Sequence, residues 1–402
     1  MIKKIKVEQL IPGMYIHDLG VKWEEHPFLS KNFKITSEKI IEKIIEAGIK
    51  EVYIDTKKGI DVKDAPTDIE VKREIEREMK KIGEKGGYGK EIENLKEEFL
   101  KTKDFIENSK KFMKKIMKDV TQYKPINKEK FEQLTEELTE NINNDTLVVL
   151  LKVKNVHEYT YLHSISVGAI MNMFCQYLKI PAHIRIDVSI GSFLHDIGKA
   201  YIPLKILNKP TKLTTQEYNF IKKHVNFSKE ILEKNENFSQ ISITTAYEHH
   251  ERYDGSGYPR GLKGEQISKF GQMIAIVDVY DAISSDRSYH KGLDPAIAIR
   301  KIFEWSEHSF NKELAYHFIR CLGIYPIGSL VKLKSNHLAV VIKQNHENLT
   351  LPTVLMIYNI PKDEFLTKPI EVDLANSDDE IISLESTITW NIDIFKYLKI
   401  KP

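Results

Sequence analysis

Apolar residues three and four positions apart recur along the middle of the chain, and this spacing predicts amphipathic helices. The pattern covers residues 131–151, 162–178, 216–232, 268–282 and 296–303. The most apolar run, from Ile165 to Leu178, is interrupted by Ser, Asn and Gln, which favours a buried helix over a membrane span. We therefore expect the central part of the chain to be mainly helical.

The two ends of the chain have a different pattern. Near the start, Ser37 precedes a predicted helix over residues 38–47, and residues 52–54 are typical of a strand. The apolar face of this helix comprises Ile40, Ile41, Ile44 and Ile45. Near the end, runs rich in β-branched residues predict strands at 329–334, 338–343 and 354–358. The pattern thus predicts a mainly α protein with a small N-terminal α/β domain and a small C-terminal β appendage.

A heptad-like seam lies in a segment rich in Lys and Glu. Apolar positions alternate spacings of three and four from Ile92 to Val120, and Thr102 and Ser109 are the polar members. A long amphipathic helix packed on its own protein would produce this seam. The alternative is a coiled coil that joins two copies of the chain through residues 92–120. The sequence leaves both open.

These changes of pattern predict four parts. The N-terminal α/β domain occupies residues 1–62, and the charged helical linker occupies residues 63–125. The helical domain, which contains most of the candidate chemistry, occupies residues 126–325, and the β appendage occupies residues 326–402.

Composition excludes several classes of protein. Sixty Lys and Arg against 58 Asp and Glu leave a net charge of +2 over 402 residues, so we expect no nucleic-acid partner. Two cysteines exclude a disulfide scaffold and a Cys-rich metal site. The first residues lack the apolar stretch of a signal peptide, and no window reaches the length of a membrane span. We expect a reducing, cytoplasmic setting.

Histidines and aspartates of the helical domain form the candidate metal site. They are His163, His195, Asp196, His224, His249, His250 and Asp278. Imidazole and carboxylate ligands without thiolate suit Fe, Mn, Zn, Co or Ni, and a structural zinc site is not expected. Seven such ligands exceed the need of one ion with open positions, so the set favours two ions that share a carboxylate.

Three segments add groups that suit a phosphate ester. Lys199 lies four residues after His195, on the same face if the segment is helical. The loop after His250 is rich in glycine, and Asp254, Gly255 and Gly257 suit turns with positive φ. Arg287, near the end of the helix that would carry Asp278, could bind a phosphodiester or pair with a neighbouring aspartate.

At these residues the sequence resembles the HD-GYP family of HD metal-dependent phosphohydrolases. The HD signature is His195-Asp-Ile-Gly-Lys199, and the GYP signature runs from His249 to Leu262. The resemblance covers roughly residues 126–325. Residues 1–62 are also similar to a domain of unknown function that often precedes HD-GYP domains.

The resemblance implies an HD-type helical bundle with two, sometimes three, divalent ions, most often Fe or Mn. It implies hydrolysis of cyclic di-GMP to pGpG, and often on to GMP, by metal-activated water. His163, His195, Asp196 and Asp278 would hold one ion, and Asp196 would bridge to a second held by His224, His249 and His250. Asp196 and Lys199 are the expected catalytic residues. The expected substrate contacts are Lys199, Arg287, Asp281, Gly255, Tyr258, Pro259 and Lys291.

The sequence departs from the family pattern at Thr211, Ser288 and His290. A third ion would need a carboxylate before His163, and the register of Glu158 does not settle this. Two functional alternatives remain: a cyclic di-GMP receptor without turnover, and a phosphohydrolase of another cyclic dinucleotide. A homodimer and signalling proteins such as a diguanylate cyclase are the expected protein partners.

Overall fold

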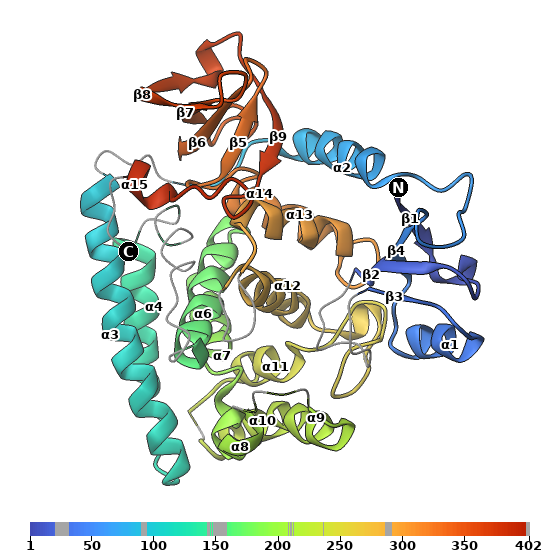
Figure 1. Cartoon of the computed structure of the whole chain (residues 1–402). Helices are drawn as coiled ribbons and strands as arrows, with labels where there is room; N and C mark the ends of the chain where they lie inside the picture. Colours follow the sequence, from blue (N-terminus) through green and yellow to red (C-terminus); the bar gives the residue numbers. More distant parts are fainter. Residues whose placement is uncertain are drawn as a thin grey trace. The chain divides into compact units, whose positions relative to one another are not determined.

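The computed structural model contains two compact units, Met1–Glu78 and Met79–Pro402, which are described separately below (Figure 1). The residues that the structure describes are 1–20, 32–89, 95–142, 145, 147, 159–207, 209, 211, 213–235, 237–285 and 292–398. Among them, none of the helices combines the length and the apolar character needed to cross a membrane.

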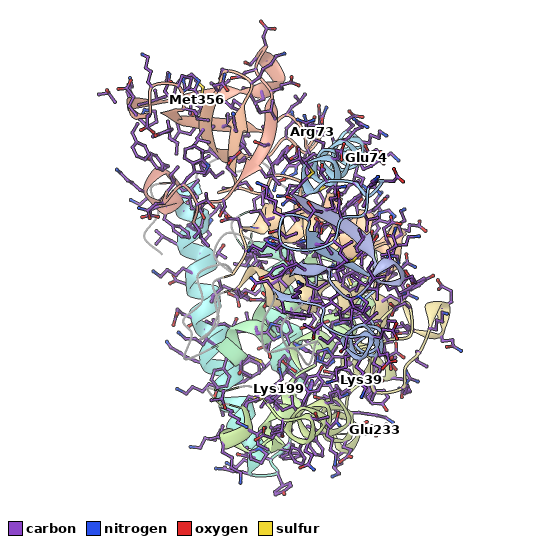
Figure 2. All side chains as sticks on the ribbon, turned by 45° about the vertical axis from the view of Figure 1, so that its right-hand side comes forward. Lys39, Arg73, Glu74, Lys199, Glu233 and Met356 are labelled. Atoms are coloured by element: carbon purple, nitrogen blue, oxygen red, sulfur yellow. The ribbon has the colours of Figure 1, made fainter. Side chains whose placement is uncertain are left out.

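The first unit is a small α/β domain. Its elements are β1 (Ile2–Lys6), β2 (Tyr15–Asp18), β3 (Phe33–Lys34), α1 (Glu38–Glu46) and β4 (Glu51–Asp55). The strands form a sheet in the order β1-β4-β2-β3, and β4 is antiparallel to both β1 and β2. Helix α1 begins after Ser37 as predicted, and Ile44 is buried in the core. Ile45 was expected on the same apolar face but is 55% exposed. Lys39, labelled in Figure 2, lies on the exposed side of α1.

The heptad-like seam packs against the chain's own helices. Helix α2 (Asp68–Gly83) is followed by the long helix α3 (Leu95–Thr121), which contacts α6. The buried seam residues are Phe99, Thr102, Ser109, Met113, Ile116 and Val120. Thr102 satisfies its hydroxyl by donating to the carbonyl of Glu98. The seam thus has the intramolecular partner of the first alternative. The dimer stays a prediction, and Ile92 lies outside the described residues.

The second unit has a helical core. Its longer helices are α4 (Lys128–Asn141), α6 (Tyr159–Tyr177), α7 (Ala182–Phe193), α10 (His224–Lys234), α11 (Gln240–Glu248), α12 (Lys269–Ser284), α13 (Pro295–Trp305) and α14 (Lys312–Leu322). Helix α12 is buried on every side from Gly271 to Ser284, and it contacts α6, α11, α13 and α14. Most of its buried residues are apolar and none of its faces is left for solvent, which explains its central place.

One predicted helix is two helices. The spacing over residues 216–232 is shared by α9 (Thr215–Lys222) and α10, which meet at Lys223. A shorter helix, α8 (Leu204–Leu207), precedes them. The break matters because it makes His224 the first residue of α10. Most of the last part of the predicted helix 131–151 lies outside the described residues.

Three of the C-terminal strands, β5 to β7, were predicted, and β8 and β9 were not. The strands are β5 (Leu330–Leu333), β6 (His337–Lys343), β7 (Thr353–Asn359), β8 (Glu364–Asp373) and β9 (Ile381–Glu385), followed by α15 (Ile394–Leu398). They form one antiparallel sheet in the order β8-β7-β6-β5-β9, and Figure 2 labels Met356 on β7. The predicted fold class, mainly α with small β units at both ends, is therefore confirmed.

The two cysteines lie inside the helical core. Burial raises the pKa of the Cys175 thiol to about 12 and raises the pKa of Cys321 well above its ordinary value. Because the thiolate is the reactive species, neither should react with a thiol reagent at pH 8 in the native protein. We expect negligible reaction with Ellman's reagent before unfolding and two thiols per chain in guanidinium. Rapid labelling of the native protein would contradict this packing.

Candidate metal centre

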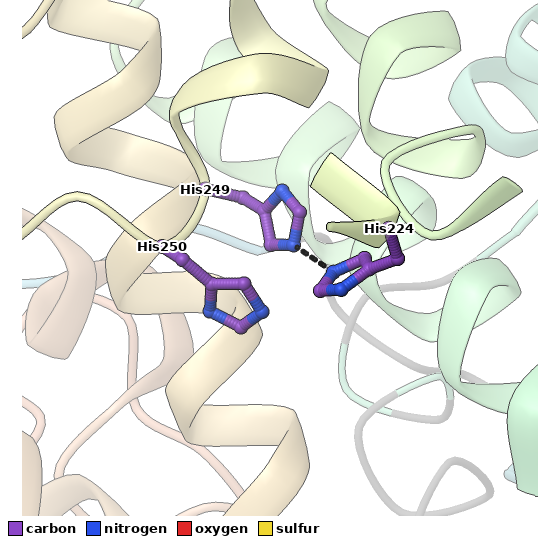
Figure 3. Close-up of side chains that lie close together, drawn as sticks. All are labelled: His224, His249 and His250. Carbon is purple, nitrogen blue, oxygen red and sulfur yellow. Dashed lines mark hydrogen bonds between the residues drawn. The ribbon is translucent and has the colours of Figure 1, made fainter. Parts of the chain in front are cut away.

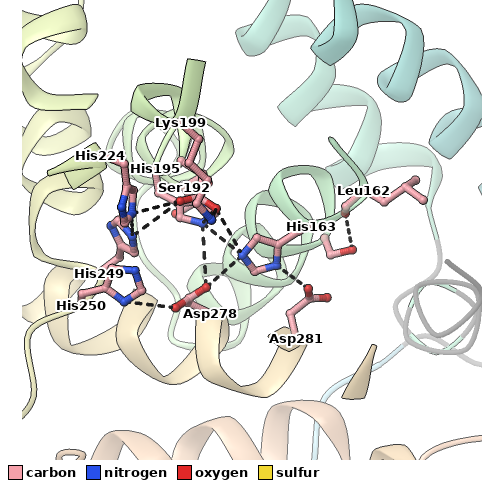
Figure 4. Close-up of polar contacts among 12 residues, drawn as sticks. Leu162, His163, Ser192, His195, Lys199, His224, His249, His250, Asp278 and Asp281 are labelled. Atoms are coloured by element: carbon pink, nitrogen blue, oxygen red, sulfur yellow. Dashed lines mark hydrogen bonds and ion pairs between the residues drawn. The ribbon is translucent and has the colours of Figure 1, made fainter. Parts of the chain in front are cut away.

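Five helices and their ends bring the predicted ligands to one place (Figure 4). His163 comes from α6 and Asp278 from α12, while His224 begins α10. His195 and Asp196 follow the end of α7, and His249 and His250 follow α11. Their candidate ligand atoms form three overlapping groups, and within each group the atoms lie within 4.8 Å of one another. All seven residues predicted from the sequence therefore belong to one cluster.

A tight turn presents His195 and Asp196. The sequence suggested a helix here, but α7 ends at Phe193 and residues 197–201 form a 3₁₀ turn. Ser228 on α10 holds the turn, because its hydroxyl donates to the carbonyl of His195 at 2.7 Å and accepts from the Gly198 N–H at 2.9 Å. A Cβ at Gly198 would lie 2.1 Å from the carbonyl oxygen of His224, so only glycine allows α10 this close.

Each of four buried histidines uses its Nδ1 atom to donate outward. The acceptors are Asp281 Oδ2 for His163 (2.6 Å), the Ser192 carbonyl for His195 (2.7 Å), the Ile221 carbonyl for His224 (2.7 Å) and the Ala246 carbonyl for His249 (2.6 Å). Carbonyl and carboxylate oxygens only accept, so the proton is on Nδ1 in each case. This leaves the four Nε2 atoms facing inward.

The inward nitrogens come close enough to need a cation between them. The Nε2 atoms of His163 and His195 are 3.3 Å apart, and those of His224 and His249 are also 3.3 Å apart (Figure 3). Two facing lone pairs repel unless a proton or a metal ion lies between them. Neutral imidazole with Nδ1 fixed by an acceptor is the usual form of a histidine that binds metal.

Asp196 lies between the two histidine pairs. Its Oδ2 is 3.7 Å from His163 Nε2 and 3.4 Å from His195 Nε2. Its Oδ1 is 3.2 Å from His224 Nε2 and 4.0 Å from His249 Nε2. Within the described residues, Oδ1 is buried and accepts no hydrogen bond. A buried carboxylate oxygen is costly without a partner, so the geometry suits one carboxylate that serves two cations.

Asp278 completes the cluster from the other side. Its Oδ1 is 3.0 Å from His163 Nε2, and its Oδ2 is 3.8 Å from His250 Nδ1. Burial acts to raise the pKa of Asp278, but the imidazoles that face it, first His163 and then His250 and His195, hold it well below its ordinary value. This carboxylate therefore stays ionised at neutral pH.

The electrostatics favour positive charge at the centre of the cluster. Burial acts to raise the pKa of Asp196, but Lys199 and His195 hold it well below its ordinary value. Burial acts to lower the pKa of His195, yet Asp196 and Asp278 raise it overall. For His249, burial and the nearby histidines lower the pKa well below its ordinary value. His249 thus resists protonation while the carboxylates stay charged, which suits a metal ion better than a proton.

Lys199 contacts Asp196 directly. Its Nζ lies 2.5 Å from Asp196 Oδ2, in an i,i+3 pair of the 3₁₀ turn. The helical spacing had predicted a place beside His195 instead, and the turn explains the difference. The lysine side chain is 21% exposed, so its ammonium lies at the edge of the cluster, between buried carboxylate and solvent.

The glycine-rich loop folds around a buried carboxylate. Glu251 is fully buried and accepts from the backbone N–H groups of Arg260 at 2.8 Å and Leu262 at 2.9 Å. Gly257 lies so close to this segment that a Cβ would be 2.3 Å from the Arg252 nitrogen. Of the positions expected to have positive φ, Gly255 has it, whereas Asp254 and Gly257 do not. The role of Glu251 was not predicted from the sequence, although its position inside the GYP signature indicated that it could be functional.

The three predicted substrate contacts of this loop do not all lie at the cluster. The Tyr258 ring lies 4.6 Å from the His250 ring at an interplanar angle of 31°, and Pro259 follows it. Gly255 packs against Lys263 in the outer turn. Thr211 is exposed. The remaining predicted positions lie outside the described residues: Glu158, Arg287, Ser288, His290 and Lys291.

Asp281, a predicted substrate contact, lies behind His163. It is buried one helical turn after Asp278, and it accepts from His163 Nδ1 at 2.6 Å. A carboxylate behind a ligating histidine fixes the tautomer and the ring orientation. Its position favours support of His163 over the predicted contact with substrate. The i,i+3 spacing from Asp278 was visible in the sequence, but the partner helix was not.

The same residues fall within matches to known families. The model described as "HD domain" matches residues 137–314, and the "Domain of unknown function (DUF3391)" model matches residues 2–131. Cyclic di-GMP phosphodiesterase PA4108 of Pseudomonas aeruginosa is 33% identical over 395 residues, which cover 97% of this chain and 94% of that protein.

Two further relatives match a smaller part of this chain. Cyclic di-GMP phosphodiesterase of Thermotoga maritima is 34% identical over 182 residues, 44% of this chain and 50% of the relative. 3'3'-cGAMP-specific phosphodiesterase 2 of Vibrio cholerae is 41% identical over 125 residues, 31% of this chain and 22% of the relative. Because the Pseudomonas relative matches from end to end and the HD match contains the whole histidine cluster, this chain belongs to the HD-GYP family of HD-domain proteins.

Proposed function

We propose that this protein is a metal-dependent phosphodiesterase that hydrolyses cyclic di-GMP, with pGpG or GMP as the product. The observation that carries the proposal is Asp196, whose two oxygens face two separate histidine pairs in a buried cluster. The names of the Pseudomonas and Thermotoga relatives support the substrate.

Two divalent ions, Fe or Mn, are the cofactors that this donor set suits. His163, His195, Asp196 and Asp278 would hold one, and Asp196 with His224, His249 and His250 would hold the other. When bound, such ions polarise the phosphodiester and lower the pKa of a water molecule. A third ion stays an expectation, because Glu158 lies outside the described residues.

The chain's own groups then bind and orient the substrate. Lys199 already lies beside Asp196 at the edge of the cluster, so its ammonium can bind a non-bridging phosphate oxygen and offset the charge that develops there. Tyr258 lies beside His250 with the ring centroids 4.6 Å apart, so it would border a substrate bound at the cluster. Arg287 and Lys291 stay predicted phosphate contacts.

Another cyclic dinucleotide is the second candidate substrate. A Vibrio relative named as specific for 3'3'-cGAMP is 41% identical over its matched region, a higher figure than for the Pseudomonas relative over its longer match. The cluster residues act on a phosphodiester and do not by themselves select the base. Substrate choice therefore depends on groups around the cluster.

The function is tested by anaerobic purification, elemental analysis and chromatography of products from cyclic di-GMP, cyclic di-AMP and 3'3'-cGAMP. We expect about two Fe or Mn per chain, and pGpG or GMP as products. Asp196→Asn should lower kcat by about a thousandfold and reduce the metal content, because both ions lose a charged ligand. The matched control is Asp187→Asn. Asp187 is a carboxylate on α7 that pairs with Lys128 on α4, away from the cluster.

Metal-replete protein that binds cyclic di-GMP tightly without product would identify a receptor and contradict the proposal. Turnover of 3'3'-cGAMP alone would select the second candidate. Full metal content and wild-type turnover in Asp196→Asn would contradict the shared carboxylate.

Support of His163 by Asp281 gives a separate prediction. Asp281→Asn should weaken metal binding by about 10- to 100-fold, because an amide does not fix the Nδ1–H tautomer as a carboxylate does. The measurement is a titration with a competing chelator, and Asp187→Asn serves again as the control. If Asp281 were instead a substrate contact, the variant would keep its metal affinity and show only a raised KM.

A further inference from the structure

We propose that Lys222 reads the guanine edge of the substrate and so determines which base the enzyme accepts. This inference rests on the proposed function and names a residue outside the cluster that selects the cyclic dinucleotide. Lys222 is the last residue of α9 and lies two positions before His224, which makes it a neighbour of the cluster in sequence as well as in space.

A continuous row of rings connects Lys222 to the cluster. The Tyr258 ring lies 4.6 Å from the His250 ring at an interplanar angle of 31°, and the Lys222 ammonium lies 5.5 Å from the centroid of the Tyr258 ring. The same ammonium lies 5.1 Å from the centroid of the Tyr218 ring, one turn earlier on α9. Lys222 is therefore held between two tyrosines at the side of His250.

Helix α9 is fixed where it begins, so the position of Lys222 is set by more than its own contacts. Thr214 and Glu217 form a capping box, in which the Thr214 hydroxyl accepts from the Glu217 N–H at 3.2 Å. Lys209 anchors the same carboxylate through both oxygens, at 2.6 and 2.8 Å. A firmly capped helix of two turns gives the ammonium a defined place.

Within the described residues, Lys222 forms no ion pair with an acidic side chain. It is half-buried, unlike the exposed Lys223, whose ammonium lies over Phe220 at 5.4 Å. A half-buried ammonium that contacts only aromatic faces keeps donors for a ligand.

The chemistry of the bases makes this donor selective. Guanine presents two acceptors, O6 and N7, on one edge, and a lysine can donate to both. Adenine presents N7 beside an N6 amino group, which is a donor and repels the ammonium. Lys222 therefore favours a cyclic dinucleotide with guanine next to the cleaved phosphodiester and disfavours one with adenine there.

The test compares wild type, Lys222→Met and Lys222→Arg on cyclic di-GMP, cyclic di-AMP and the base-free diester bis(p-nitrophenyl) phosphate. Lys222→Met should raise KM for cyclic di-GMP about tenfold with little change in kcat, and should reduce the preference over cyclic di-AMP by about the same factor. The base-free diester should be hydrolysed at the wild-type rate. Lys222→Arg should restore the preference, since a guanidinium donates to the same edge.

Lys223→Met is the matched control, because it removes a neighbouring ammonium outside the row of rings. Equal losses on both cyclic dinucleotides would assign Lys222 to phosphate and overturn the inference, as would an equal loss on the base-free diester. Calorimetry then measures the affinity of wild type and Lys222→Met for the two cyclic dinucleotides, and so tests the same contact independently of turnover. Wild type that binds and cleaves neither dinucleotide would overturn the proposed function, whereas normal wild-type turnover with unchanged Lys222→Met overturns only this inference.

Discussion

The whole site depends on where each imidazole places its two nitrogens. Four buried histidines donate a hydrogen bond from Nδ1, either to a carbonyl at the end of a helix or to Asp281 on α12. Their Nε2 atoms therefore converge. Three of these acceptors are carbonyls three residues earlier in the chain, in the last turns of α7, α9 and α11. The helix ends thus both satisfy their own polar groups and orient the ligands.

Much of this was visible in the sequence. The apolar spacing identified α4, α6, α12 and α13, and β-branched runs identified β5, β6 and β7, because both patterns report directly which face is buried. Helices α7, α11 and α14 and strands β8 and β9 were not predicted. The ligand set could also be named, since His195-Asp196 and His249-His250 stand in a recognisable pattern. The spacing of residues could not show whether Asp281 faces solvent or a neighbouring helix. Its partner, His163 on α6, is 118 residues away in the sequence.

Two other contacts could not be predicted from the sequence because they depend on local geometry. Lys199 was placed beside His195 on the assumption of a helix, whereas α7 ends before the signature and a 3₁₀ turn brings Lys199 to Asp196. The Tyr218–Lys222–Tyr258 contact joins α9 to the loop after α11, and neither segment alone indicates it. Where partners are distant in sequence, periodicity shows that a face is buried but not what covers it.

In the proposed enzyme, the ion pair of Lys199 with Asp196 would link metal binding to substrate binding. Asp196 Oδ2 faces His163 and His195, and it also receives the Lys199 ammonium at 2.5 Å. A divalent ion between those three groups would repel an ammonium so close to the same oxygen, since like charges in a buried site interact strongly. The lysine would then turn toward the exposed side, where a phosphodiester supplies the negative charge that it has lost. Asp196 would then be the ligand shared by the two proposed ions and would also release the cation that binds their substrate.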